Sequence, residues 1–195
     1  LSFSSHKLQG PRGIGVLLHR PGVLAHPLLT GGGQEGGYRA GTEAVALIAG
    51  LAVALQQLPR FNPQQSMAPP GSTPQIRSMR DRLQSKLAAI PSLTVINATD
   101  EPRLPHHLAC LIGDRAGHPL AGRRLVQQLS RLGVACSSGS ACRSGHAQDS
   151  AVLTAMNVAP SWRQSLLRFS LGPWLSDDDL DAVPPLLIRA IDACT

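Results

Sequence analysis

The sequence is poor in aromatic and charged residues, and it contains no long apolar run. Aromatic residues make up only 3% of the 195 positions, which argues against the base-stacking surfaces that bind single-stranded nucleic acid. Charged residues make up 15%, against about 25% in a typical globular domain. No stretch of about 18 uncharged apolar residues is present, so the sequence predicts no membrane-spanning helix. Apolar residues still amount to 43%, which is enough to build a buried core.

Cysteine is also scarce. The four cysteines, Cys110, Cys136, Cys142 and Cys194, lack the close pairs of zinc sites and the dense spacing of small disulfide scaffolds. We therefore expect no metal site, and reduced thiols in a cytoplasmic protein. Residues 1–7 have neither the basic nor the apolar region of a signal peptide. The formal net charge of +6 comes from scattered arginines, which favours a solvated basic surface over a nucleic-acid or membrane partner.

Glycine and proline are abundant, with 19 and 16 residues, and they divide the chain. Six glycines between positions 31 and 41 predict a loop with little preference for one local conformation. Prolines cluster between positions 61 and 74, which is typical of a linker. We therefore expect one domain at residues 1–58, a linker at 59–74 and a second domain at 75–195.

Apolar runs and helix signals alternate along the chain, which is typical of an α/β architecture. Thr42 is a plausible N-cap for a helix at 43–58, with Glu43 in its first turn. Ser176 and the three following aspartates open a last helix, whose pattern is interrupted by Pro184 and Pro185. The other expected helices are 75–89, 119–132 and 150–158, and the expected strands are 1–5, 13–18, 93–96, 108–112, 134–136 and 166–170.

Lys7 follows an apolar strand and precedes the turn-forming residues Gly10 and Pro11. A lysine at a strand end can be held in a partly dry pocket, where a neutral amine can form a Schiff base. Its neighbours Ser4 and His6 carry a hydroxyl and an imidazole that could bind a phosphate. From these residues alone, an ordinary surface lysine remains the alternative.

Two further residues carry chemistry. Cys142 lies in Ser-Gly-Ser-Ala-Cys-Arg-Ser-Gly, where small residues permit an exposed loop and Arg143 favours the nucleophilic thiolate. A small buried cysteine is the alternative. Arg168 lies in an otherwise apolar strand, so its guanidinium needs an anionic partner, either a substrate carboxylate or an internal salt bridge.

Taken in order, these segments closely resemble the cysteine desulfurases of the class V aminotransferase family. The segments are Ser-Ser-His-Lys, Gly-Pro-Arg-Gly-Ile-Gly, Gly-Gly-Gly-Gln-Glu-Gly-Gly-Tyr-Arg-Ala-Gly-Thr, Ser-Ser-Gly-Ser-Ala-Cys and Arg-Phe-Ser-Leu-Gly. The resemblance runs from residue 1 to about residue 185, and the cysteine motif is similar to that of the NifS and IscS branch. It implies fold type I of the enzymes that depend on pyridoxal 5'-phosphate (PLP), with the end of the large domain at 1–58 and the small domain at 75–195. A complete family member is about twice as long, so the chain looks like its carboxyl-terminal half.

The resemblance also implies roles for single residues. Lys7 is similar to the lysine that forms the Schiff base, and Ser4 and His6 to ligands of the cofactor phosphate. Thr42 resembles a threonine that reaches the phosphate of the partner subunit in a homodimer. Arg168 resembles the arginine that holds the substrate carboxylate, and Cys142 the cysteine that takes up sulfur. No such role is implied for Cys136.

The implied activity is removal of sulfur from L-cysteine, which leaves L-alanine and a persulfide on Cys142. A sulfur-acceptor or iron–sulfur scaffold protein would then receive the sulfur. Two other hypotheses remain open at this point. One is a PLP-dependent cysteine or cystine C–S lyase, which has no need of Cys142, and the other is a non-catalytic fragment that serves as a dimerisation or binding module.

Overall fold

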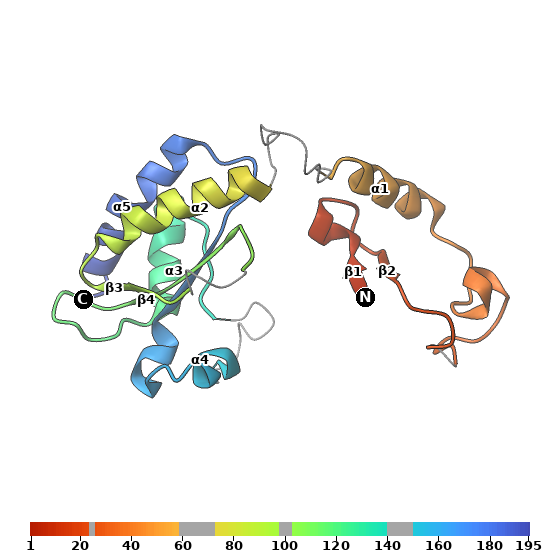
Figure 1. Ribbon diagram of the computed structural model, residues 1–195, viewed down its shortest axis with the longest axis horizontal. Coiled ribbons are helices and arrows are strands. Elements are labelled where there is room, and N and C mark those ends of the chain that lie inside the picture. The colour runs from red at the N-terminus through yellow and green to blue at the C-terminus, as the bar shows by residue number, and fades with distance from the viewer. Residues whose placement is uncertain (24–25, 59–72, 98–102, 140–149) are drawn as a thin grey trace. The chain divides into compact units, whose positions relative to one another are not determined.

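The chain forms two compact units, residues 1–60 and 61–195 (Figure 1). The computed structural model describes residues 1–23, 26–58, 73–97, 103–139 and 150–195. Each unit has its own sheet, so the two are described separately.

The first unit begins with a two-stranded antiparallel sheet. Strand β1 (Ser2–Ser4) pairs with strand β2 (Gly15–Leu17), with Phe3 opposite Val16. Both strands lie inside the ranges expected from the sequence. The residues of β1 are exposed or half-buried. The 3-10 helix η1 (Ser5–Leu8) follows β1 directly.

The glycine-rich segment contains a second 3-10 helix, η2 (Gln34–Gly37), and then leads to helix α1 (Val45–Gln56). The helix starts later than expected, and its N-cap is Ala44, which makes no side-chain cap. The prediction of Thr42 as N-cap is therefore wrong. Every residue of α1 is apolar, glycine or the final glutamine. Only Leu51 and Ala54 of α1 are buried within the unit, while Val45 is 70% exposed, so most of its apolar surface is open.

The second unit is built on a three-stranded antiparallel sheet, in the order β3 (Leu93–Val95), β4 (His107–Ile112) and β5 (Leu166–Ser170). The three strands confirm the sequence expectation. The strand expected at 134–136 is wrong, because Ser137 and Arg168 pair only through an isolated bridge.

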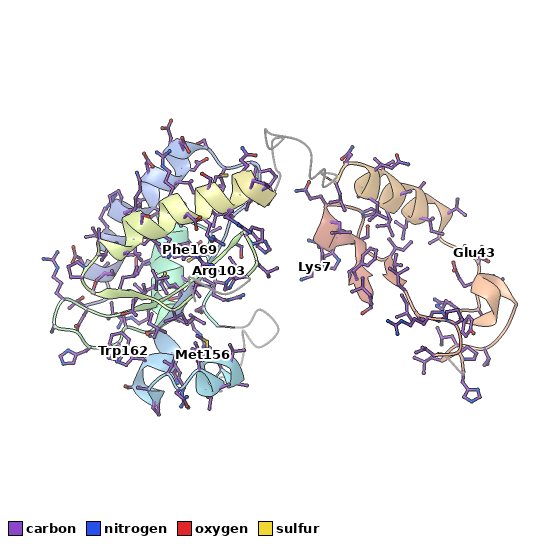
Figure 2. The ribbon with its side chains drawn as sticks, viewed as in Figure 1. Lys7, Glu43, Arg103, Met156, Trp162 and Phe169 are labelled. Atoms are coloured by element: carbon purple, nitrogen blue, oxygen red, sulfur yellow. The ribbon has the colours of Figure 1, made fainter. Side chains whose placement is uncertain are left out.

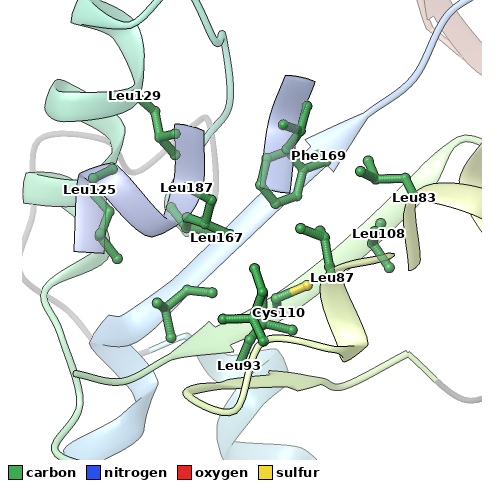
Figure 3. Packing of buried hydrophobic residues seen from close by; sticks show 14 of the residues in the cluster. Leu83, Leu87, Leu93, Leu108, Cys110, Leu125, Leu129, Leu167, Phe169 and Leu187 are labelled. Atoms are coloured by element: carbon green, nitrogen blue, oxygen red, sulfur yellow. The ribbon is translucent and has the colours of Figure 1, made fainter. Parts of the chain in front are cut away.

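Helices cover one face of this sheet. Helices α2 (Thr73–Ala88), α3 (Gly122–Arg131) and α5 (Asp177–Asp192) lie against it. Residues that alternate along β4 and β5 point into this core, among them Leu108, Cys110 and Leu167, which are fully buried (Figure 3). The other face carries a smaller apolar cluster around helix α4 (Ala151–Ala155) and the 3-10 helix η4 (Pro160–Ser165).

The helix ends follow local chemistry. The Ser176 hydroxyl accepts a hydrogen bond from the Asp179 backbone N–H, and the Asp179 carboxylate accepts one from the Ser176 backbone N–H. This capping box fixes the start of α5 where the sequence predicts it. Helix α5 continues through Pro184 and Pro185. Helix α3 is followed by Gly133 with φ 86°, the expected stop signal. No helix in the described ranges has the length and apolar character needed to span a membrane.

Candidate active-site residues

Lys7 lies on η1, the short turn that joins β1 to the chain leading into β2 (Figure 2). The turn is closed by backbone hydrogen bonds: Ser5 N–H donates to Ile14 over 3.0 Å, and Gly10 N–H donates to Ser5 over 3.1 Å. Gln9 has φ 63°, a left-handed conformation that costs a residue other than glycine some energy. Lys7 itself is exposed, so the described residues do not provide the dry pocket that the sequence suggests.

Lys7 and Ser4 line the same pocket, together with Ser2 and Phe3. The pocket has a volume of about 380 Å³. Its lining residues carry a primary amine on Lys7 and hydroxyl groups on Ser2 and Ser4. An amine that can react with an aldehyde, next to hydroxyl donors for an anion, fits an aldehyde cofactor that carries a phosphate. His6 is exposed on the same turn, but it does not line this pocket.

Thr42 lies in an exposed segment between η2 and α1. The preceding Gly41 has φ 100°, and its N–H donates to the Gln34 side-chain oxygen over 3.3 Å. Thr42 does not line the pocket of Lys7. The first unit therefore brings Ser4 and Lys7 together and leaves Thr42 facing solvent.

Arg168 lies on β5 opposite Ala109 of β4. Its backbone N–H donates to Ser137 over 2.7 Å, and Ser137 N–H donates back over 3.1 Å. The side-chain Nε is buried and has no hydrogen-bond partner, and none of the carboxylates in the described ranges forms a salt bridge with Arg168. A buried guanidinium N–H without an acceptor is costly, so the site fits an anionic ligand.

His107 faces the same side of the sheet as Arg168 and was not anticipated from the sequence. Partial burial lowers the pKa of His107, and the positive charge of Arg168 lowers it further. The sequence carries no signal for this neighbour, because the antiparallel register of β4 and β5 is what brings the two side chains together.

The cysteines differ in reactivity. Cys142 and Arg143 lie outside the described residues. Cys110, Cys136 and Cys194 are free thiols. Burial raises the pKa of the Cys110 thiol to about 12 and that of Cys136 to about 11. Both thiols are therefore protonated and weakly nucleophilic at neutral pH.

The sequence pattern of the class-V aminotransferases matches residues 1–183. The chain belongs to this family. Class-V aminotransferases use PLP, and the pocket with Lys7 and Ser4 has donors that suit it. The α/β fold is that of the fold type I enzymes, which confirms the expected fold class.

Curated relatives are cysteine desulfurases. The chain is 34% identical over 193 residues to "Cysteine desulfurase NifS" of Azotobacter vinelandii, an alignment that covers 97% of this chain and 45% of the relative. It is 36% identical to "IscS-like cysteine desulfurase" of Mycobacterium tuberculosis, over 98% of this chain and 46% of the relative. Among solved structures, the cysteine desulfurase CsdA from Escherichia coli matches with a TM-score of 0.73 and 25% identity, over all of this chain and 46% of that one.

A solved structure of a NifS-like protein matches equally well, with a TM-score of 0.73 and 28% identity over 98% of this chain and 45% of that one. The chain thus spans about half the length of the curated relatives it matches.

Proposed function

We propose that this chain is the part of a cysteine desulfurase that supplies the PLP-binding lysine, the substrate-binding arginine and the sulfur-accepting cysteine. The observation that carries the proposal is Cys142 in its Ser-Gly-Ser-Ala-Cys motif, in a chain whose curated relatives are cysteine desulfurases. A C–S lyase would have no need of that cysteine. The reaction would convert L-cysteine into L-alanine and a persulfide on Cys142.

Each proposed residue has a task that suits the chemistry of its side chain. PLP, when bound, supplies an electron-withdrawing ring that stabilises negative charge on the substrate carbon. Lys7 would hold the cofactor aldehyde and then move a proton at that carbon through its Nζ. Ser4 and His6 would bind the cofactor phosphate. Arg168 would bind the substrate carboxylate with its guanidinium, whose Nε has no protein partner.

Sulfur transfer would take place at Cys142. Its Sγ, as thiolate, would attack the sulfur of the substrate, so that the S–S bond of the persulfide forms as the C–S bond breaks. The electron pair of the C–S bond remains with the substrate carbon, which takes up a proton and leaves as alanine. Cys110 and Cys136 would not compete for the sulfur, because both thiols are protonated at neutral pH.

Further features are part of the same proposal. Residues 1–58 would complete a large PLP-binding domain, with 59–74 as linker and 75–195 as the small domain. The exposed position of Thr42 supports its role towards a partner subunit in a homodimer. The free thiols suit a cytoplasmic protein, and the persulfide would pass to an acceptor or scaffold protein for iron–sulfur clusters.

The test of cofactor attachment uses the only two lysines in the sequence, Lys7 and Lys86. The gene product at its natural length is loaded with PLP, reduced with borohydride, digested and analysed by mass spectrometry. We expect the PLP mass on Lys7, and loss of both PLP attachment and alanine formation in Lys7→Ala. Lys86 forms an ion pair with Asp181, so Lys86→Ala is the matched control and should keep both. PLP fixed on Lys86 would overturn the assignment.

A further inference from the structure

On the β3–β4–β5 sheet, the face that carries Arg168 has an apolar end and a polar end. In the paired strands, Leu111 lies opposite Leu166, Ala109 opposite Arg168 and His107 opposite Ser170. Leu111 and Leu166 are covered by the apolar cluster that includes Leu153 and Trp162. At the other end of the face, His107 and Arg168 are half-buried and Ser170 is exposed.

The register places His107 and Arg168 diagonally across the two strands. Diagonal neighbours on one face are about 7–8 Å apart at the backbone, which long side chains can span. Ala109, opposite Arg168 and two residues after His107 on β4, carries only a methyl group and is itself buried. The small side chain leaves room for the Arg168 guanidinium to lie beside the His107 ring, and the effect of the Arg168 charge on His107 supports this closeness.

Asn97 determines which ring nitrogen of His107 can carry a proton. The Asn97 side-chain oxygen accepts a hydrogen bond from the Ala109 backbone N–H over 2.5 Å. Because a backbone N–H can only donate, this bond fixes the orientation of the amide, and the Asn97 NH₂ group is then the atom that faces His107 Nδ1 at 3.4 Å. An NH₂ group can only donate, so Nδ1 must accept. With Nδ1 as the acceptor, this geometry corresponds to a neutral ring with its proton on Nε2.

A protonated ring would be unfavourable here. It would point an Nδ1–H at the Asn97 NH₂ group and place a second positive charge beside Arg168. The other charged or titratable groups that act on His107 are His106 on the same segment and Arg103, and both also oppose its protonation. The arrangement thus provides a neutral N–H donor next to a guanidinium whose buried Nε has no acceptor.

We propose that His107 is a second substrate-binding residue, whose neutral ring donates from Nε2 to the carboxylate that Arg168 binds. The proposal rests on the proposed function, since that function supplies the amino-acid carboxylate. His107 adds direction rather than charge: a carboxylate held by a guanidinium and one further donor has one orientation, whereas a lone ion pair allows several. Asn97 is then a positioning residue that acts through His107.

The kinetic test compares two substitutions of the same residue in the gene product at its natural length. His107→Leu removes the donor and should raise KM for L-cysteine about tenfold, with kcat changed less than about twofold, because the contact is present in both ground and transition states. His107→Gln places an amide N–H near the position of Nε2 and should keep KM within about threefold of the parent value. His118 is exposed and has its own partner, Asp114, so His118→Leu is the control and should leave KM unchanged. A His107→Leu variant with parental KM would overturn the proposal.

The second measurement does not depend on turnover. Nitrogen-15 NMR of labelled histidine in the gene product at its natural length should show His107 neutral, with its proton on Nε2, at neutral pH. Addition of L-alanine, the proposed product, should shift that signal in the parent chain and not in Arg168→Ala. If the parent forms no alanine yet the signal shifts, the proposed function fails and the carboxylate site stands. A protonated His107, a proton on Nδ1, or no shift with L-alanine would overturn the site itself.

Discussion

The Ser5 hydroxyl fills the space that a β-carbon on Gly10 would need. Ser5 is fully buried, and its Oγ has no hydrogen-bond partner. A β-carbon on Gly10 would also lie 3.2 Å from the Ala54 side chain of α1. Lys7 stands between Ser5 and Gly10 in the chain, so the turn that carries it is held against α1 by this close packing.

Gly10→Ala should therefore destabilise the lysine turn. We expect a loss of roughly 1–3 kcal/mol from overpacking, measured as faster hydrogen exchange of the Ser5 and Gly10 amides. In a Ser5→Gly background the same substitution should cost about 1 kcal/mol less, because the blocking hydroxyl is gone. Gly33 has no atom within 4 Å of its β-position, and Gly33→Ala is the matched control. Equal costs in both backgrounds would show that Ser5 does not limit the space at Gly10.

The sequence predicts the parts of the fold that depend on local apolar patterns. The strands at Leu93–Val95, His107–Ile112 and Leu166–Ser170 follow from apolar runs between turn residues. Local sequence patterns do not predict that α5 continues through Pro184 and Pro185. A proline inside a helix costs about 3 kcal/mol or more, so the sequence leaves the continuity of this helix open. Leu180, Val183 and Leu187 are nevertheless buried on both sides of the two prolines. Their burial offsets that cost, and burial depends on the tertiary structure.

The residues of the candidate site also differ in whether the sequence alone identifies them. Lys7, Ser4 and Arg168 are found from motifs, and the structure places the first two in one pocket. His107 and Asn97 have no motif, because their relation arises from the pairing of β3 with β4 and of β4 with β5. Thr42 is not the N-cap of α1, because the helix begins at Val45 and has no side-chain cap.

Removal of the Arg168 side chain should weaken substrate binding. Arg168→Ala is expected to raise KM for L-cysteine by a factor that corresponds to roughly 2–4 kcal/mol, typical of a truncated charged pair in a desolvated site. The measurement is steady-state alanine formation, with Arg123→Ala on the exposed side of α3 as control. Unchanged kinetics together with lower stability would assign Arg168 a structural role instead.

Stability should depend on pH through His107. Its pKa is lowered in the folded state by burial and by Arg168, so below the ordinary histidine value of 6.5 the unfolded chain binds a proton that the folded chain does not. The free energy of unfolding should therefore fall as the pH decreases from about 7 to 5. In His107→Gln this fall should be smaller, as measured by urea unfolding at each pH. The folded-state pKa values of Asp114, Asp179 and Asp181 are lowered from 3.8. Those carboxylates therefore change the free energy of unfolding only at lower pH. Identical pH profiles would contradict the account of His107.

The thiols should alkylate in a defined order. At pH 8, a thiol with a pKa of about 12, such as Cys110, has a thiolate fraction on the order of one in ten thousand. With iodoacetamide and peptide mass spectrometry, Cys142 should react first, and Cys110 and Cys194 should lag far behind until urea unfolds the chain. Labelling of Cys110 in the folded chain as fast as Cys142 would contradict this order.

The most direct test of the central claim is the fate of sulfur in Cys142→Ser. The substitution keeps the shape of the side chain but leaves a far poorer nucleophile at neutral pH. Because Lys7 and Arg168 are untouched, the variant should bind PLP and L-cysteine as the parent does. We predict that it forms no alanine and gains no sulfur mass, whereas the parent forms alanine and carries one added sulfur on Cys142. Alanine, or pyruvate with sulfide, produced at the parental rate would show that sulfur leaves without Cys142, and the protein would then be a C–S lyase.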